Sequence, residues 1–301
     1  MSVFNEEEYL EEMLDSLLAQ TYTDWRLIVR NNGSTDTTEE ILKSFKYKFP
    51  NKILLIDGTK NILPVYQSFS EALNFSESEY VMFADGDDVW LKDKISKSLD
   101  HLISIEEKYS KKTPILVFTD LNITDKSLNI ISTSMWNYQS LNPENTSLNR
   151  MIMHDVACGN TFIFNKALSD KIYPIPEDGI MHDRWTALVA TTFGKISYIK
   201  NSTMLYRQHG ENTCGSETIS SQLLKYLGDI PLIKKRINDK SLLAQAFLKQ
   251  FEKDLNENQK IILYDVANFS KFGFIQKRIK LFKHSLYMNS IIRNLGLFLL
   301  A

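Results

Sequence analysis

The segment YVMFADGDDVW, residues 80–90, carries three carboxylates within four positions. Asp85, Asp87 and Asp88 follow directly on an apolar run. Carboxylates this close repel one another unless a cation lies among them. Oxygen ligands are those that Mg²⁺ and Mn²⁺ prefer, and such ions commonly bridge to substrate phosphates. The cluster therefore predicts a divalent-cation site, and the alternative is a solvated turn in which Asp88 caps the following helix.

Two further segments place polar groups where a strand gives way to a helix. In RNNGSTD, residues 30–36, Gly33 allows a tight turn and Ser34 can cap the next helix. Backbone amides at such a turn favour a phosphate or a base edge, although ordinary turn chemistry explains the same residues. In MHDRWTALV, Asp183 opens an apolar helix, where it is either an N-cap or a general base. His209, at the end of a strand, is either a metal or phosphate ligand or a plain surface residue.

Strand-like and helix-like patterns alternate along the first part of the chain. β-Forming runs at 25–30, 52–57, 80–85 and 114–120 are separated by segments with helical apolar spacing. This alternation predicts an α/β fold with a mostly parallel, Rossmann-like sheet flanked by helices. The acidic cluster then lies at the carboxyl end of a strand, where open α/β sheets bind ligands. From about residue 218 the pattern is helical, so we expect one domain over 1–215 and a helical C-terminal extension over 216–301.

Charge is distributed unevenly between these two parts. Residues 216–301 hold 14 Lys+Arg and 7 Asp+Glu, whereas residues 1–215 have a net charge of −9. Residues 271–301 carry six basic residues and no acidic ones. This tail is either a solvated helix face or a segment attracted to an anionic membrane surface. Nucleic acid is not an expected partner, because the acidic body would repel it.

The remaining composition predicts a protein of the cytoplasm. Cys158 and Cys214 form neither a disulfide framework nor a metal-ligand pair by spacing. The start of the chain lacks a basic region followed by an apolar run, so no signal peptide is expected. No apolar run reaches the length of a membrane span.

Five motifs in unbroken order resemble the family-2 glycosyltransferases of the GT-A fold, in particular the branch often labelled rhamnosyltransferase-like. The resemblance covers roughly residues 1–215. The motifs that carry it are SVFNEEEYLEEMLDSLLAQTYTDWRLIVRNNGSTDTTEEIL, ADGDDVWLKDKI, CGNTFIFNKAL, MHDRWTALVATTFGKISYI and YRQHGENTCG.

This resemblance implies an inverting transfer of a sugar from a nucleoside-diphosphate donor. It assigns Asp85 and Asp87 to a Mn²⁺ or Mg²⁺ ion at the diphosphate, with Asp88 and His209 as further ligands, and Asp183 as the catalytic base. The residues expected at the donor are Asn5, Asn31, Asn32, Ser34, Asp85 and Gly86. The residues expected at the acceptor are Gly159, Asn160, Thr161, His182 and Trp185.

The same resemblance implies a dTDP- or UDP-sugar donor, with rhamnose or a hexose as the sugar. The acceptor would be a glycan or a lipid-linked glycoconjugate of bacterial surface polysaccharide synthesis. We accordingly expect a cytoplasmic enzyme, peripheral on the inner face of the plasma membrane and in contact with it through residues 271–301.

The sequence departs from the family pattern at three places. Asn31 and Asn32 stand where relatives have two aspartates, Leu63 stands near a usual glycine, and relatives have more of the first strand before SVFN. An asparagine amide can still donate to and accept from a pyrimidine ring. Two alternatives stay open: a non-catalytic or weakly active sugar-nucleotide-binding relative, and a phosphohydrolase that uses the D-x-D as a nucleophile and acid pair.

Overall fold

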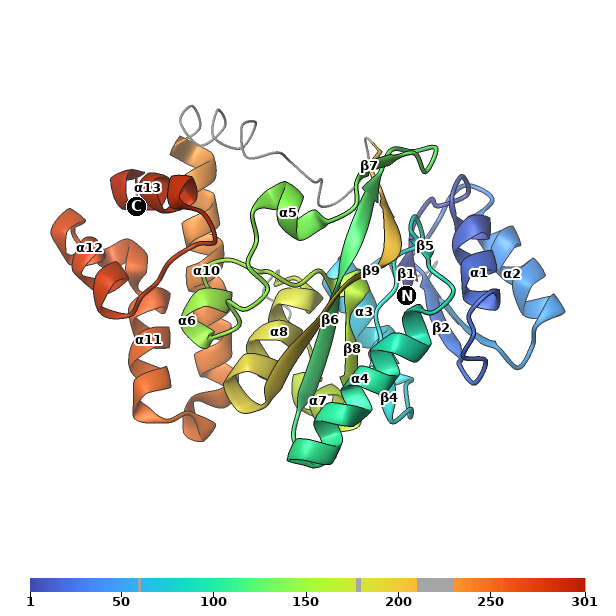
Figure 1. Cartoon of the computed structure of the whole chain (residues 1–301), viewed down its shortest axis with the longest axis horizontal. Coiled ribbons are helices and arrows are strands. Elements are labelled where there is room, and N and C mark those ends of the chain that lie inside the picture. Colours follow the sequence, from blue (N-terminus) through green and yellow to red (C-terminus); the bar gives the residue numbers. More distant parts are fainter. Residues whose placement is uncertain (59–60, 177–179, 210–229, 301) are drawn as a thin grey trace. The chain divides into compact units, whose positions relative to one another are not determined.

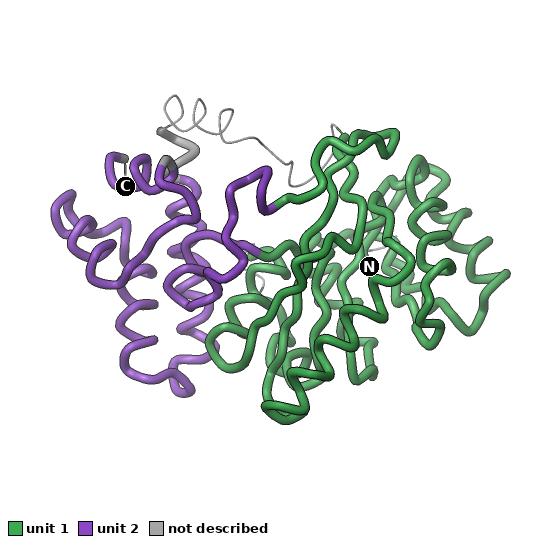
Figure 2. Tube along the Cα trace, in the orientation of Figure 1, with its two compact units in different colours: residues 1–135, 157–215 green, residues 136–156, 216–301 purple. Residues whose placement is uncertain are grey.

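The protein folds into two compact units. The computed structural model describes residues 1–58, 61–176, 180–209 and 230–300, whose helices and strands are labelled in Figure 1. One unit comprises residues 1–135 and 157–215, and the other comprises residues 136–156 and 216–301 (Figure 2).

The first unit is built from alternating strands and helices. In chain order its elements are β1 (Ser2–Val3), α1 (Leu10–Leu18), β2 (Leu27–Asn31), α2 (Thr38–Lys48), β3 (Ile53–Asp57), α3 (Val65–Asn74), β4 (Tyr80–Met82), β5 (Val89–Trp90), α4 (Lys94–Tyr109), β6 (Ile115–Thr124), β7 (Ile130–Ser132), the 3₁₀ turn η1 (Gly159–Thr161), β8 (Ile163–Asn165), α7 (Lys166–Ile172), α8 (His182–Phe193) and β9 (Lys195–Arg207). The predicted alternation of strand and helix is therefore present in the fold.

Within the described residues, the strands form two sheets. One has the order β1-β2-β3 and is parallel throughout. The other has the order β4-β8-β6-β9-β5, with β7 on β6, and in it only the β6–β9 pair is parallel. The α/β class is confirmed, while the expected parallel direction holds for the first sheet and for β6–β9. The other pairs run antiparallel because the regular alternation stops after β6.

The long strand β9 brings distant parts of the chain together. It runs parallel to β6 and antiparallel to the short strand β5, with Val89 opposite Leu205 and Trp90 opposite Met204. Antiparallel pairing advances one residue on each strand in opposite directions. The residues just before β5 therefore meet the residues just after β9, which are more than 110 positions later in the chain.

Alternating side chains of the second sheet pack against different helices. Ile115 and Val117 of β6 form a cluster with Leu99 and Leu102 of α4. On β8, Ile163 joins this cluster, whereas its neighbour Phe164 contacts the ring of Phe83. Successive strand residues point to opposite faces, so α4 covers one face of the sheet and the aromatic residues near α8 fill the other.

The second unit is helical. Its elements are α6 (Leu148–Met151), α10 (Ile230–Phe251), η2 (Glu252–Asp254), α11 (Glu257–Ala267), η3 (Phe269–Lys271), α12 (Phe274–Lys283) and α13 (Ile291–Leu300), and α5 (Met135–Gln139) begins at the boundary between the units. Among the described residues, no helix is both long and apolar enough to cross a bilayer.

Residues 136–156 differ from the predicted domain arrangement, which placed them with the first domain. Asn149 Nδ2 donates to the carbonyl oxygens of His284 (3.0 Å) and Ser285 (3.1 Å). The guanidinium of Arg150 lies 5.5 Å from the centre of the Tyr287 ring. These contacts join residues about 135 positions apart, so no local sequence pattern predicts them.

Candidate active site

The acidic loop follows β4 and is packed against the loop after β1. A Cβ on Gly86 would lie 3.0 Å from Val3 Cγ1 and 3.2 Å from Glu6 Cγ, so the close approach of the two loops favours glycine. Asp85 is half-buried, and burial raises its pKa to about 7 with further contributions from the carboxylates of Asp87 and Asp183. Negative charge thus collects at this point of the fold.

Asp87 faces the end of β9. His209 Nε2 lies 2.9 Å from Asp87 Oδ2, and the two side chains are 11% and 14% exposed. The His209 ring packs on Tyr9, with ring centres 4.8 Å apart. The structure therefore brings together two of the predicted metal ligands and leaves both partly accessible.

Asp88 points into the protein and is fully buried. Its Oδ2 accepts from Asn160 Nδ2 (2.6 Å), and its Oδ1 accepts from the backbone N–H of Arg207 (3.3 Å). Burial, together with the charges of Asp87 and Asp85, raises the pKa of Asp88 well above its usual value. The structure does not support the expected ligand role of Asp88, because both of its oxygens are engaged inside the protein.

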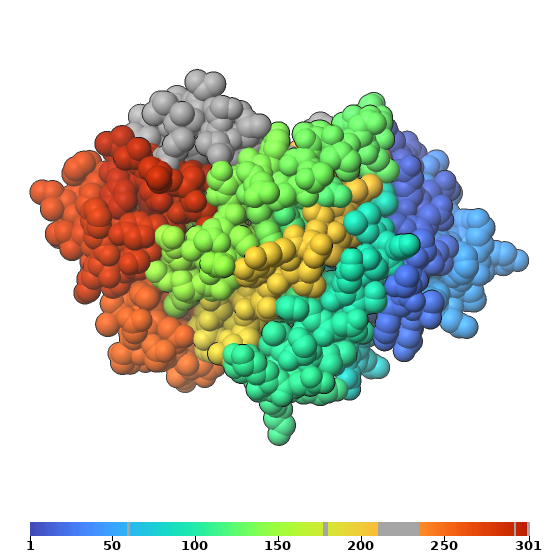
Figure 3. All heavy atoms as spheres, in the orientation of Figure 1, coloured from blue at the N-terminus to red at the C-terminus, as the bar shows by residue number. Residues whose placement is uncertain are grey.

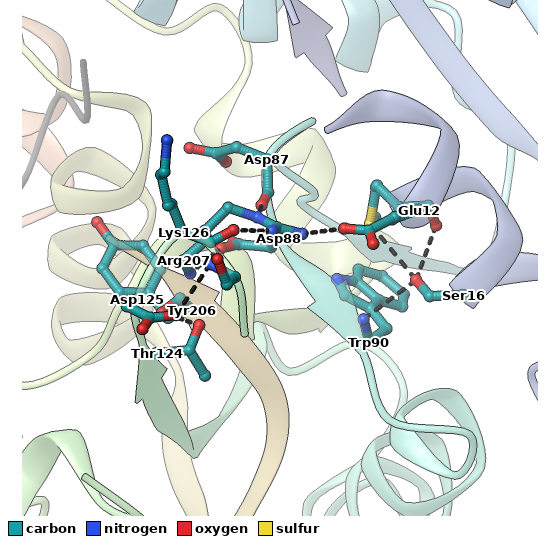
Figure 4. Close-up of polar contacts among 12 residues, drawn as sticks. Glu12, Ser16, Asp87, Asp88, Trp90, Thr124, Asp125, Lys126, Tyr206 and Arg207 are labelled. Atoms are coloured by element: carbon teal, nitrogen blue, oxygen red, sulfur yellow. Dashed lines mark hydrogen bonds and ion pairs between the residues drawn. The ribbon is translucent and has the colours of Figure 1, made fainter. Parts of the chain in front are cut away.

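Arg207 ties the acidic loop to two other segments (Figure 4). Its Nε donates to the carbonyl oxygen of Asp87 (2.9 Å), its Nη1 to that of Lys126 (2.5 Å), and its Nη2 to the carboxylate of Glu12. The guanidinium also lies 4.7 Å from the ring centre of Tyr9, and the side chain is only 3% exposed. A planar group with donors on several sides is suited to such a junction.

Lys94 supplies a second cation beneath the loop. Its side chain is fully buried, and its Nζ donates to the carbonyl oxygen of Asn160 (2.9 Å) and lies 4.7 Å from the ring centre of Trp90. Burial lowers the pKa of Lys94 to about 7, while Asp88 and other acidic groups oppose that fall. Part of the positive charge expected near the three aspartates therefore comes from a buried lysine of the protein itself.

Asp183 lies in the first turn of α8, close to the acidic loop. Burial raises the pKa of its carboxyl group, although Arg184 and nearby backbone N–H groups oppose the change. Arg184 N–H donates to Asp183 Oδ1 at 2.7 Å. A Cβ on Gly159 would lie 2.8 Å from Asp183 Cβ, so that residue lies directly against it. A half-buried carboxylate with a raised pKa is typical of a general base.

The other expected acceptor residues are buried. Trp185 is fully buried and donates from Nε1 to the carbonyl oxygen of Ile172 (3.0 Å). His182 stacks on Phe69 at 3.8 Å, and burial lowers its pKa to about 3. Asn160 and Thr161 are at most 3% exposed. These four side chains support the loop and the core, so their burial argues against direct contact with an acceptor.

The predicted donor residues gather at the carboxyl ends of β1 and β2. Asn5, with a φ of 54°, accepts from Thr35 N–H through Oδ1 (2.8 Å), and its own N–H donates to Ser34 Oγ (3.0 Å). Gly33 has a φ of 85°, which glycine adopts without strain. The two strand-end loops are thus joined beside the acidic loop.

Asn31 and Asn32 have different surroundings although they are adjacent. Asn32 exchanges hydrogen bonds with the backbone of Leu63, accepting at 3.0 Å and donating at 2.7 Å, and it also accepts from Arg30. Asn31 Oδ1 accepts from Ser34 N–H (3.0 Å), but its buried Nδ2 has no hydrogen-bond partner among the described residues. An unpaired buried amide is costly, which makes Asn31 the better candidate for contact with a base.

The residues at this edge partly fit a divalent cation. No group of three or more His, Cys, Asp or Glu side chains is arranged around a metal position within the described residues. Nevertheless, burial and the charges of Asp87 and Asp183 raise the pKa of Asp85, and a cation between Asp85 and Asp87 would oppose that rise. Asp85 and Asp87, with His209 beside them, are therefore the candidate metal ligands.

Comparison with known proteins identifies the family. The family model described as Glycosyl transferase family 2 matches residues 1–171. The chain belongs to glycosyl transferase family 2. It is 27% identical to the dTDP-rhamnosyl transferase RfbG of Shigella flexneri over 76% of this chain and 78% of that protein. It is 26% identical to an uncharacterized glycosyltransferase of Haemophilus influenzae over 87% of this chain and 83% of that protein.

Solved structures share the fold of this family 2 glycosyltransferase. S. aureus TarS 1-349 in complex with UDP-GlcNAc has a TM-score of 0.52 and 18% identity, covering 94% of this chain and 77% of that chain. The mannosyltransferase PcManGT from Pyrobaculum calidifontis, in complex with GDP-Man and Mn2+, has a TM-score of 0.52 and 13% identity, covering 95% of this chain and 84% of that chain. The predicted family, GT-A fold and enzyme class are thereby confirmed.

Sequence reasoning does not single out two residues of the candidate site, Arg207 and Lys94. They lie inside the motifs YRQHGENTCG and ADGDDVWLKDKI. The signal for them is closeness to expected ligands, because Arg207 lies two residues before His209 and Lys94 lies six residues after Asp88. Residues 210–215 of the former motif lie outside the described residues, as does Cys214.

Asp85→Asn tests whether the negative charge of Asp85 destabilises the protein when no metal is bound. A carboxyl group with a folded pKa of about 7 binds a proton that the unfolded chain, with a pKa near 3.9, releases. The free energy of unfolding therefore falls as pH rises from about 4 through 7. We expect Asp85→Asn in EDTA to raise the melting temperature by about 2–4 °C more at pH 8 than at pH 5. An equal shift at both pH values would contradict this.

Arg207→Lys tests the junction that holds the loop. Lysine keeps the charge but cannot reach the carbonyl oxygens of Asp87 and Lys126 together with Glu12. We expect the free energy of unfolding to fall by about 1–3 kcal/mol in urea titrations. Glu12→Gln is the matched control, because Glu12 is 58% exposed and its loss should change stability by less than about 0.5 kcal/mol. Equal stability of the two variants would contradict the role of Arg207.

Proposed function

We propose that this enzyme transfers a sugar from a nucleotide-sugar donor to an acceptor hydroxyl, with inversion at the anomeric carbon. The observation that carries the proposal is the approach of Asp183 to the acidic loop. Asp183 contributes to the raised pKa of Asp85, after burial and the charge of Asp87. The candidate general base, Asp183, thus lies near Asp85 and Asp87, the candidate ligands of a metal at the donor diphosphate. A reaction in which the acceptor displaces the diphosphate in one step requires these groups to be close together.

The donor nucleotide would bind along the ends of β1 and β2. The unpaired Nδ2 of Asn31 can donate to a carbonyl oxygen of a pyrimidine ring, and the backbone around Ser34 can face ribose or phosphate. Names of similar proteins include a dTDP-rhamnosyl transferase and complexes with UDP-GlcNAc and GDP-Man. We propose a pyrimidine donor, dTDP-rhamnose or a UDP-hexose, because the dTDP-rhamnosyl transferase is aligned over most of the chain.

Mn²⁺ or Mg²⁺ is the proposed cofactor. Asp85 and Asp87 would hold it, and His209 would orient Asp87 through the 2.9 Å contact. When bound, such an ion stabilises negative charge on a leaving diphosphate. Arg207 and Lys94 keep the loop in place from inside, so that the two aspartates stay close although their charges repel.

Asp183 is the proposed general base. It would accept the proton of the acceptor hydroxyl while that oxygen bonds to the anomeric carbon and the nucleoside diphosphate departs with the bonding electron pair. The raised pKa of Asp183 improves its proton affinity, and Gly159 lies directly against its side chain. Partial burial also limits the water that could compete with a sugar hydroxyl.

A glycan or lipid-linked glycoconjugate of bacterial surface polysaccharide synthesis is the proposed acceptor. We also propose a cytoplasmic location with peripheral contact to the inner face of the plasma membrane. Nucleotide release with and without acceptor separates transfer from mere binding, and a phosphatase assay tests the phosphohydrolase alternative.

Nucleotide selectivity follows from the proposed donor site. We expect UDP or dTDP with Mn²⁺ to raise the melting temperature more than GDP does, because a ligand stabilises according to its affinity for the folded state. Asp87→Ala should remove the Mn²⁺-dependent part of this shift while the apo protein keeps its fold. A larger shift with GDP would refute the pyrimidine assignment, and an unchanged Mn²⁺ effect in Asp87→Ala would refute the metal assignment.

Asp183→Asn separates catalysis from donor binding. Asparagine is nearly isosteric and retains an oxygen that can accept from Arg184 N–H, but it cannot take a proton. A positioned base contributes about 10²- to 10⁴-fold, so sugar transfer should fall by that factor while the donor-induced thermal shift stays constant. Transfer near the wild-type rate would show that another group is the base. Glu177 and Asp178, the other carboxylates considered, lie outside the described residues.

A further inference from the structure

Helix α12 presents apolar side chains to the outside of the helical unit. Ile275, Ile279 and Phe282 are 72%, 57% and 63% exposed. Their spacing of i, i+4 and i+7 places them on one face of the helix. In contrast, Leu281 is fully buried on the inner side. An amphipathic helix normally buries its apolar face, so this arrangement needs a partner for the exposed one.

Helix α13 has a second exposed apolar row. Ile291, Leu295 and Leu299 are 81%, 57% and 68% exposed and are spaced at i, i+4 and i+8. The spacing again places all three on one helix face. Leu297, on the other side of the helix, is 1% exposed.

Helices α12 and α13, which carry the two rows, contact each other. The rings of Phe282 and Phe298 are 4.9 Å apart, and Arg278 Nε donates to the carbonyl oxygen of Phe298 (2.9 Å). The C-terminal helices lie at the surface in the space-filling view, where they are red (Figure 3). We define the α12–α13 surface by the residues Ile275, Ile279, Phe282, Ile291, Leu295 and Leu299.

Charge decides which partner fits this surface. Residues 271–301 contain six Lys and Arg and no Asp or Glu. Lys271 and Lys283 are exposed near the two ends of α12, whereas Lys280 is paired with Asp265 at 2.8 Å. A second copy of the chain would bring like charges together around the apolar rows. An anionic lipid surface instead attracts the lysines and accepts the apolar side chains.

We propose that the α12–α13 surface docks on an anionic phospholipid bilayer, with both helices lying in the interface. Ten-residue helices are about 15 Å long, which suits an orientation in the membrane plane. The apolar rows supply the insertion and the lysines supply the preference for anionic headgroups. This docking would hold the enzyme where a lipid-linked acceptor is found, but it does not depend on the sugar chemistry.

Vesicle flotation with the full chain tests the proposal. We expect binding to phosphatidylcholine vesicles that contain phosphatidylglycerol, weak binding to pure phosphatidylcholine, and release in high salt. The double variant Ile275→Ser/Ile279→Ser should lower the ratio of vesicle-bound to free protein at least tenfold without changing the melting temperature. Ile130→Ser with Ile131→Ser is the matched control, since these residues of β7 are 51% and 50% exposed, and it should bind like the wild type.

A charge variant separates the two contributions. Lys271→Gln with Lys283→Gln should lower binding to anionic vesicles but leave the weak binding to neutral vesicles unchanged. Failure of the wild type to float with anionic vesicles would overturn the proposal, as would equal binding by the Ile275→Ser/Ile279→Ser variant. A concentration-dependent dimer that this variant loses, in the absence of vesicle binding, would overturn it in favour of self-association.

Discussion

Electrostatic repulsion at the end of β4 is the constraint on which the proposed site depends. Asp85, Asp87 and Asp88 are close in sequence, and folding brings Asp183 near them. Water would screen these charges in the unfolded chain, but partial burial removes much of that screening. In the fold, the three aspartates of the loop have different surroundings. Asp88 is buried and hydrogen-bonded, while Asp85 and Asp87 stay partly exposed.

Internal cations make these different surroundings possible. Lys94 lies beneath the loop and Arg207 fixes its backbone, so neither occupies the accessible side of Asp85 and Asp87. Side chains of the protein itself therefore hold the loop in place. This matters for a donor-dependent enzyme, because a preformed loop need not be ordered at the moment of binding.

Packing also explains why several polar residues of the motifs are not at the surface. Asn160 spans between Asp88 and Lys94 through its amide and its carbonyl oxygen. Asn32 holds the backbone of Leu63, and Trp185 holds the carbonyl oxygen of Ile172. These side chains support the residues proposed to touch substrate. Loss of any one of them would leave a buried polar group unpaired, which is costly.

The sequence by itself determined the α/β class, the place of the acidic cluster at a strand end and the family, because these rest on local periodicity and on contiguous motifs. It also indicated the basic tail. Only the tertiary structure decided that Asp88, His182 and Trp185 turn inward, since the direction of a side chain in a loop or on a helix depends on what packs against it. The same holds for the association of residues 136–156 with the helical unit and for the role of Arg207. Each joins positions far apart in the chain, and only the fold brings such positions within hydrogen-bonding distance.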